Sequence, residues 1–431
     1  MNNKIGLRKW LMFILAGFVG QLAWAIENNY LNMYVFGVTG IYDFIPTMTA
    51  LSAVAATITT LFIGALSDRL GKRRLFISIG YILWGISIIA FAFLDPNSTL
   101  TIINNDLFLA GSLIVVLDCI MTFFGSTAND ACFNASVNDL TDETNRGKVE
   151  SVLSVLPLFA LIAVTLVGGI FGVGNTAGNP VHWDYFFYVF GGLTLVIGIL
   201  SLFVYPKDTI TPKKDEQYMK ELIFGFRPTV VKDNKKLYLA LLAFMIFNIA
   251  IQVFMPYMMV YIQSIPDLDF IVTLGIVLVI ASIITVVVGL FMDRIGRSKL
   301  VFPALGVAMA GGIIMFFVNN QIGIIIGGII LMSGYLCSTA ILGSKVRDYI
   351  PEHRAGSFQG VRMVFVVMVP MVTGPYIGKG VSYIQGHMYE NEYGYQSIQP
   401  NHYIFLFSAI IMLLAIIPLL LLIKKENEKS A

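Results

Sequence analysis

The 431-residue sequence has little of what most enzymes and secreted scaffolds depend on. Only 13% of its residues are charged, against roughly a quarter in a typical soluble domain. The three cysteines all lie inside apolar runs, where they are read as packing residues and not as a disulfide framework: Cys119, Cys132 and Cys337. The four histidines lack metal-ligand spacing: His182, His353, His387 and His402. We therefore expect no metal site, no cofactor and no enzyme activity.

Apolar residues dominate instead, at 57% of the chain. Runs of about 20 apolar residues, each able to cross a bilayer core of roughly 30 Å as a helix, recur along its whole length. Twelve spans are predicted, at residues 10–36, 44–66, 75–94, 107–136, 149–172, 184–205, 238–262, 270–291, 300–318, 322–345, 358–381 and 402–423. The fold class expected is therefore an all-α integral membrane protein.

The basic residues predict the orientation of these spans. If the N-terminus is inside, every one of the 28 lysines and arginines except Lys379 lies in an inside segment. We expect an inner (plasma) membrane protein with both termini in the cytoplasm. The net charge of +2 then belongs to a cytoplasmic belt and does not indicate a nucleic-acid partner.

Two sequence motifs occur once in each half of the chain. "GALSDRLGKRR" (64–74) recurs as "GLFMDRIGRSK" (289–299), and "NDLTDETNRGK" (138–148) has a counterpart in "RDYIPEHRAGS" (347–357). Each pair follows the second and the fourth span of its half. This pattern predicts two parallel repeats of six spans around a central site.

The repeats predict the domain boundaries. We expect a six-helix half at 1–205, a cytoplasmic linker at 206–237 and a second half at 238–431. The middle of the linker, "EQYMKELIFGF", has the spacing of a surface amphipathic helix but is equally well read as a solvated connector.

Gly64, Asp68, Arg69, Gly71, Lys72 and Arg73 match the loop 2–3 signature of the major facilitator superfamily, and the chain resembles that family over nearly its whole length. "GQLAWAIENNYLNMYVF", "NDACFNASVNDLTDETNRG" and "VRDYIPEHRAGSFQGVRM" most resemble the sucrose-type and glycoside–pentoside–hexuronide cation symporters. The resemblance implies twelve helices in two halves, a central cavity and alternating access.

The loop motifs are predicted to form the cytoplasmic gate. Gly64 would allow span 2 to pack closely on a neighbour, and Asp68 would meet a helix N-terminus or an arginine across the joint. The resemblance implies that this contact lies near the start of span 11, at 357–360. For Lys72 to Arg74, a role in anchoring the topology is the simpler reading. The gating set is Gly64, Asp68, Arg69, Gly71, Arg73, Asp139, Arg146, Gly289, Asp293, Arg294, Gly296, Arg297, Asp348, Arg354 and Arg362.

Three acids lie within spans: Glu27, Asp118 and Asp130. A charge there costs roughly 2.5–3.5 kcal/mol, and no base lies deep in a span to neutralise it; only Arg362 is in a position to approach Asp130. Co-transport of H⁺ or Na⁺ is the remaining way to neutralise them. On a regular helix Asp118 and Asp130 point about 120° apart, so Asp130 is the better coupling candidate and Asp118 a hydrogen-bond partner. The alternative for Glu27 is a place near the outer interface.

Amides and aromatic rings on spans 1, 4, 7 and 10 predict a ligand rich in hydroxyls. The substrate-binding set is Gln21, Trp24, Asn28, Asn129, Asn248, Gln252, Tyr257 and Tyr335. A helix break is expected around Pro256, the alternative being a tolerated kink without a role. We expect a monomer that imports a small sugar or glycoside. The alternative is a proton-coupled efflux pump for apolar molecules, whose site would be more uniformly apolar. Whether the outer loop at 383–402 forms a lid stays open.

Overall fold

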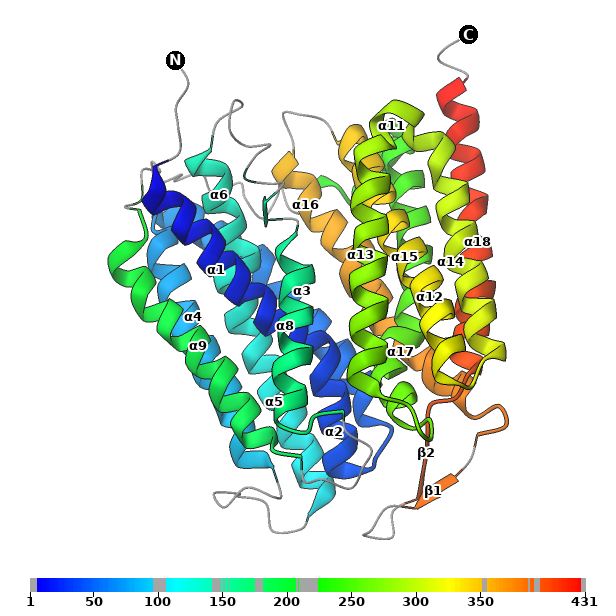
Figure 1. Ribbon diagram of the computed structural model, residues 1–431. Helices are drawn as coiled ribbons and strands as arrows, with labels where there is room; N and C mark the ends of the chain where they lie inside the picture. The colour runs from blue at the N-terminus through cyan, green and yellow to red at the C-terminus, as the bar shows by residue number, and fades with distance from the viewer. Residues whose placement is uncertain are drawn as a thin grey trace. The chain divides into compact units, whose positions relative to one another are not determined.

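The structure is a computed structural model that describes residues 6–95, 106–141, 149, 152–153, 155–174, 181–206, 208, 224–350, 355–386, 388–390 and 396–427. The chain divides into two units, Met1–Glu216 and Gln217–Ala431. Each unit is built almost entirely of long helices (Figure 1). The two units are described separately below.

Unit 1 contains six spans, two of which are interrupted by π-helical turns. Its elements are α1 (Leu7–Ala25), η1 (Ile26–Tyr30), α2 (Leu31–Thr39), α3 (Phe44–Leu70), α4 (Arg73–Ala90), the 3₁₀ turn η2 (Phe91–Leu94), α5 (Leu107–Gly125), η3 (Ser126–Phe133), α6 (Asn134–Leu140), α8 (Leu156–Ile170) and α9 (Trp183–Val204). The first span is α1, η1 and α2 together, and the fourth is α5, η3 and α6.

Unit 2 repeats the count of six spans. Its elements are α11 (Pro228–Asp233), α12 (Lys235–Gln263), α13 (Phe270–Ile295), α14 (Arg297–Phe317), α15 (Gln321–Tyr349), α16 (Ala355–Met363), the π turn η5 (Val364–Met368), α17 (Val369–Ser382), β1 (Met388–Glu390), β2 (Gln396–Ile398) and α18 (Tyr403–Asn427). The strands β1 and β2 pair antiparallel in the segment before α18, which the sequence analysis did not predict.

The predicted all-α membrane architecture is confirmed. Within the described ranges, eleven helices are long and apolar enough to cross a membrane, and the apolar α8 is a shorter twelfth, at 15 residues. Their bounds agree with the predicted spans to within a few residues at most ends. At Pro256 the expected helix break was wrong and the alternative of a tolerated proline holds: α12 continues through the buried Pro256, because a membrane helix can tolerate the lost hydrogen bond.

Close helix packing in unit 1 depends on glycines of spans 3 and 6. A Cβ on Gly85 of α4 would lie 2.5 Å from the backbone nitrogen of Leu195 on α9, and one on Gly198 would lie 2.5 Å from that of Ile82. Figure 1 shows α4 and α9 running side by side. In a bilayer, where packing and not the hydrophobic effect joins helices, such contacts fix the scaffold on which the polar residues of spans 1 and 4 are held.

Candidate functional site

The polar residues of spans 1 and 4 coincide with the two π turns of unit 1. In η1 the N–H of Leu31 bonds to the carbonyl of Ile26, and in η3 the N–H of Asn134 bonds to that of Asn129. Such i→i−5 turns are rare and are frequent at functional sites. Side-chain amides satisfy carbonyls one turn back, with Asn28 donating to Trp24 O at 2.9 Å and Asn29 to Ala25 O at 3.0 Å.

Glu27 is the central acid of the site. Its side chain is 7% exposed, which excludes a position at a solvated interface. Its Oε1 accepts a hydrogen bond from Oγ1 of Thr122 in span 4 at 2.7 Å. Its Oε2 has no hydrogen-bond partner among the residues that the structure describes. One carboxylate oxygen therefore remains available to a proton or a cation.

Asp118 and Asp130 flank Glu27 along span 4. Both repel the Glu27 carboxylate, Asp118 the more strongly of the two. Asp118 is 1% exposed and lies against the Ser52 hydroxyl, and its Oδ1 has no partner within the described ranges. Asp130 accepts from Ser126 Oγ at 3.1 Å. Whereas the sequence analysis preferred Asp130, the structure groups Asp118 with Glu27, because Thr122 lies one turn beyond Asp118 on α5.

The ion pairs found in the described part of the chain do not include these three acids. The arginine and lysine pairs found there hold other acids instead: Asp68, Asp139 and Glu426. The site is thus acidic, buried and without a basic partner among those pairs. Such a site favours binding a positive ion or a proton.

Trp24 and Asn129 belong to one hydrogen-bonded network. Trp24 Nε1 donates to Asn129 Oδ1 at 3.4 Å, and Asn129 Nδ2 donates to Tyr81 Oη at 2.8 Å. Tyr81 Oη in turn donates to Ala16 O at 2.7 Å. Asn129 is 3% exposed and lies beneath the half-buried Trp24, so it is not positioned to contact a ligand directly. Tyr81 was not predicted as a site residue. It lies in an apolar span, and no neighbouring residue in the sequence indicates that its hydroxyl takes part in a hydrogen-bonded network.

The remaining polar residues on span 1 are more open. Asn28 is exposed and Gln21 is half-buried. Together with Trp24, they present two amides and an indole over two turns of one helix. These groups can bind hydroxyls and the apolar face of a sugar ring.

In unit 2 the predicted substrate residues have different surroundings. Asn248 Nδ2 donates to Val366 O in η5 at 2.9 Å, and the half-buried Gln252 packs against Gly374. Tyr257 is fully buried and donates to Pro375 O at 2.6 Å, so it joins α12 to α17 and does not face a ligand. Tyr335 is half-buried and its ring stacks on Phe247, with centroids 6.3 Å apart.

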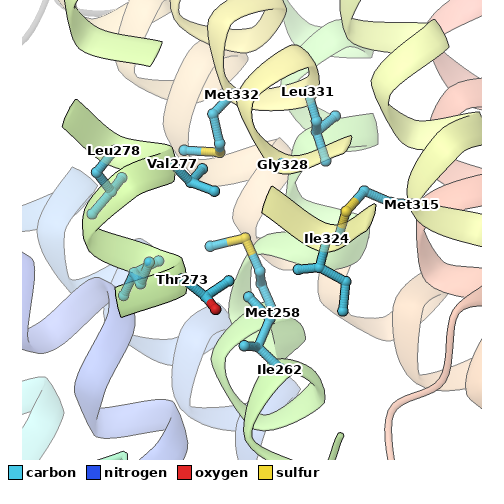
Figure 2. Close-up of a pocket in the computed structure, with 11 residues that line it drawn as sticks. Met258, Ile262, Thr273, Val277, Leu278, Met315, Ile324, Gly328, Leu331 and Met332 are labelled. Carbon is cyan, nitrogen blue, oxygen red and sulfur yellow. The ribbon is translucent and has the colours of Figure 1, made fainter. Parts of the chain in front are cut away.

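Unit 2 also encloses an apolar cavity between α12, α13, α14 and α15 (Figure 2). Three methionines contribute to its lining: Met258, Met315 and Met332. Its one hydroxyl, that of Thr273, is fully buried and has no partner in the described structure. The cavity is therefore unsuited to a sugar, which needs many hydrogen-bond partners.

The loop between α3 and α4 forms a charged cluster. Gly71, with φ of +61°, ends α3 in the left-handed conformation that glycine tolerates. The turn brings Arg73 back so that its Nη2 lies 2.7 Å from Asp68 Oδ1 and its Nε 2.6 Å from Asp139 Oδ2. Arg73 is 8% exposed. A role in anchoring the topology does not by itself explain why Arg73 is buried and paired with two acids. Asp68 forms its ion pair within unit 1.

The other predicted gating residues are placed as follows. Arg69 and Asp348 are exposed, and Gly64 and Arg362 are half-buried. A Cβ on Gly289 would meet open space. Gly296, directly before α14, has a φ of +97°. Outside the described part lie the side chains of Asp293, Arg294 and Arg297, the residues Arg146 and Arg354, and residues 207 and 209–223 of the linker. The predicted contact of Asp68 with span 11 joins the two units and stays a prediction.

A second ion cluster in unit 2 was not predicted. Lys345 is 3% exposed, and its Nζ lies 2.8 Å from Glu426 Oε1 and 2.7 Å from Ser298 Oγ. Tyr349 also donates to Glu426. From the sequence, Lys345 was predicted to lie in an inside segment with the other basic residues. No local pattern in the sequence pairs it with an acid of the last helix.

Comparison with known proteins identifies the fold. The family model described as Major Facilitator Superfamily matches residues 10–375. Among curated proteins none matches the sequence. Solved structures with similar folds include a mutant of the nucleoside transporter NupG, with a TM-score of 0.73, 11% identity and coverage of 96% of this chain and 99% of that one.

Two further structures are similar. The xylose transporter XylE from E. coli, in a partially occluded inward-open conformation, has a TM-score of 0.66 at 16% identity, covering 94% of this chain and 97% of that one. A bacterial homologue of the human lysosomal transporter Spinster has a TM-score of 0.67 at 11% identity, covering 97% and 98%. At these identities the similarity establishes the fold alone.

Proposed function

Because the chain belongs to the Major Facilitator Superfamily, we propose that it is a secondary transporter that imports a sugar or glycoside together with a proton or a sodium ion. The observation that carries this proposal is the Glu27 site. Glu27 and Asp118 each keep one buried oxygen without a partner in the described structure. Neither acid belongs to an ion pair of the described residues, and burying either as an ion is costly, so a co-transported cation is the natural counter-charge.

The coupling follows from alternating access. When the site opens to water on one side, the solvent stabilises the charged carboxylates and the cation dissociates; when the site closes, burial favours the neutral, cation-loaded form. A substrate that prefers the loaded state then moves with the cation. Glu27 and Asp118 would bind it, and Asp130 would tune the site through its charge and its bond to Ser126.

A sugar-like substrate is supported by the exposed polar groups of span 1. Gln21, Trp24 and Asn28 combine an indole face with two amides, and within unit 2 we assign the half-buried amide of Gln252 to substrate binding as well. Two of the structural neighbours are named as a xylose transporter and a nucleoside transporter. These substrates share a pentose ring. We further propose that the chain acts as a monomer in the inner membrane, with cytoplasmic termini and a gate at the Arg73 cluster.

The test is uptake by purified protein in proteoliposomes. Mono-, di- and oligosaccharides are first ranked by how far each raises the melting temperature, with and without Na⁺. The best sugar is then supplied in radiolabelled form under an imposed pH or Na⁺ gradient. Accumulation that an ionophore abolishes supports the proposal. Failure of every sugar to bind or accumulate, with gradient-driven expulsion of an apolar dye, would establish efflux instead.

A further inference from the structure

Gly20 on α1 is packed directly against the hydrogen-bonded network behind Trp24. A Cβ at this position would lie 2.3 Å from Asn129 Nδ2 and 2.6 Å from Tyr81 Oη. Both distances are far inside van der Waals contact, so an alanine there must displace both groups. Neither is the free end of a flexible chain, because each is held by hydrogen bonds.

The network restrains Asn129 from two sides. Its Oδ1 accepts from Trp24 and its Nδ2 donates to Tyr81, whose hydroxyl is itself anchored on Ala16 O. Moving the amide away from a new methyl group would therefore break the Trp24 bond, the Tyr81 bond or both. The other contacts of the tryptophan do not replace this restraint, since they are ring contacts without a fixed donor and acceptor.

Trp24 is the most open member of the cluster. It is half-buried, whereas Tyr81 and Trp84 are fully buried. The Trp84 ring lies 5.1 Å from that of Trp24 and 5.6 Å from that of Tyr81, which forms a rigid aromatic support. Asn129 is the one member that fixes the indole by its N–H, and thereby the rotation of the ring plane on that support.

We propose that Asn129, Tyr81 and Gly20 are positioning residues that set the orientation of the Trp24 indole, and through it the selectivity for the sugar ring that stacks on this indole. The inference rests on the proposed function for its ligand, but the positioning itself does not. It changes the role of Asn129 from a substrate contact to a support. It also gives a role to Gly20, which was not among the predicted site residues.

The neighbouring Gly17 supplies a matched control. It lies one turn earlier on the same helix, and a Cβ there would lie 2.9 Å from Cδ1 of Leu156. A leucine methyl can rotate away at small cost, so Gly17→Ala adds the same methyl group to α1 without moving the network. Differences between the two alanine variants therefore report on the contact with Asn129.

The experiment uses ¹⁹F NMR of the full chain labelled with 5-fluorotryptophan, which gives four resonances for its four tryptophans. Trp24→Phe assigns the Trp24 resonance. Gly20→Ala is expected to shift it and Gly17→Ala to leave it in place. In an Asn129→Ala/Tyr81→Phe background, Gly20→Ala should cause no further shift, because both groups that it displaces are gone. An unmoved resonance in the single variant, or an equal shift in both backgrounds, would overturn the proposal.

Two further arms keep the test decisive. If Gly20→Ala fails to fold, Tyr81→Phe removes the same restraint without adding volume and must shift the resonance. With the sugar identified in the uptake assay, Gly20→Ala should raise KM roughly fivefold, the value of one hydrogen bond, while Vmax is kept. A shifted resonance in a protein that binds no sugar would contradict the proposed function and leave the positioning role intact.

Discussion

Glu27→Gln offers the sharpest test of cation coupling. Glutamine has the shape of glutamate and can still accept the Thr122 hydrogen bond at Oε1, but it carries no charge and cannot be protonated in the transport range. The variant also removes the repulsion between Glu27 and Asp118. We therefore expect it to fold as stably as the wild type or more so, by at most the roughly 2.5–3.5 kcal/mol that an intramembrane charge costs.

The expected transport phenotype is large. One positive charge moving through 100 mV supplies about 2.3 kcal/mol, which corresponds to roughly 50-fold accumulation of a sugar that travels with it. In proteoliposomes with an imposed potential and cation gradient, the wild type should approach that ratio and Glu27→Gln should stay near unity. Counterflow, which exchanges labelled for unlabelled sugar without a gradient, should persist.

Asp95→Asn is the matched control, because Asp95 is another buried acid of unit 1 and lies outside the site, at the end of η2. It should still accumulate the sugar. Accumulation by Glu27→Gln at the wild-type ratio would refute the reasoning, since the acid would then be structural. Loss of counterflow together with a lowered melting temperature would show that the variant had unfolded.

Three further outcomes are expected. Arg73→Met removes both ion pairs of the Arg73 cluster and should destabilise the protein in thermal melts by about 1–3 kcal/mol, between the values of exposed and of buried ion pairs, with Arg73→Lys between it and the wild type; an unchanged melt would contradict the cluster. Thr273→Val replaces a buried hydroxyl that has no partner in the described structure by a methyl group, and it should raise the free energy of unfolding by about 1–3 kcal/mol. Its control, Thr165→Val, removes the hydrogen-bond acceptor of the Tyr30 hydroxyl and should lower the free energy of unfolding. Tags after Lys213 and at the C-terminus should be cytoplasmic and a tag at Asn391 outside, and an inside tag at Asn391 would contradict the twelve-span topology.

Much of the fold was predictable because the bilayer restricts what a sequence can do. Spans of about 20 apolar residues are helices, and lysines and arginines mark the inside, so the number and bounds of the helices follow from local composition. The three intramembrane acids were recognisable for the same reason, since a charge in an apolar run stands out.

Partnerships between distant residues were not predictable. Thr122 on Glu27, Asp139 on Arg73 and Glu426 on Lys345 each join residues that are far apart in the chain, and the sequence has no local pattern that pairs them. The π turns and the continuity of α12 through Pro256 were not predictable either. Local backbone geometry of this kind depends on how neighbouring helices pack against the segment and not on its composition alone.

The sequence by itself therefore determined the helices, their predicted orientation and the presence of acids that need a counter-charge, because hydropathy and charge act residue by residue. Only the tertiary structure decided which oxygen of Glu27 is left without a partner, and that Asn129 lies beneath Trp24 in the space that Gly20 leaves open. Those properties depend on the distance between side chains of different helices, and helix packing sets that distance.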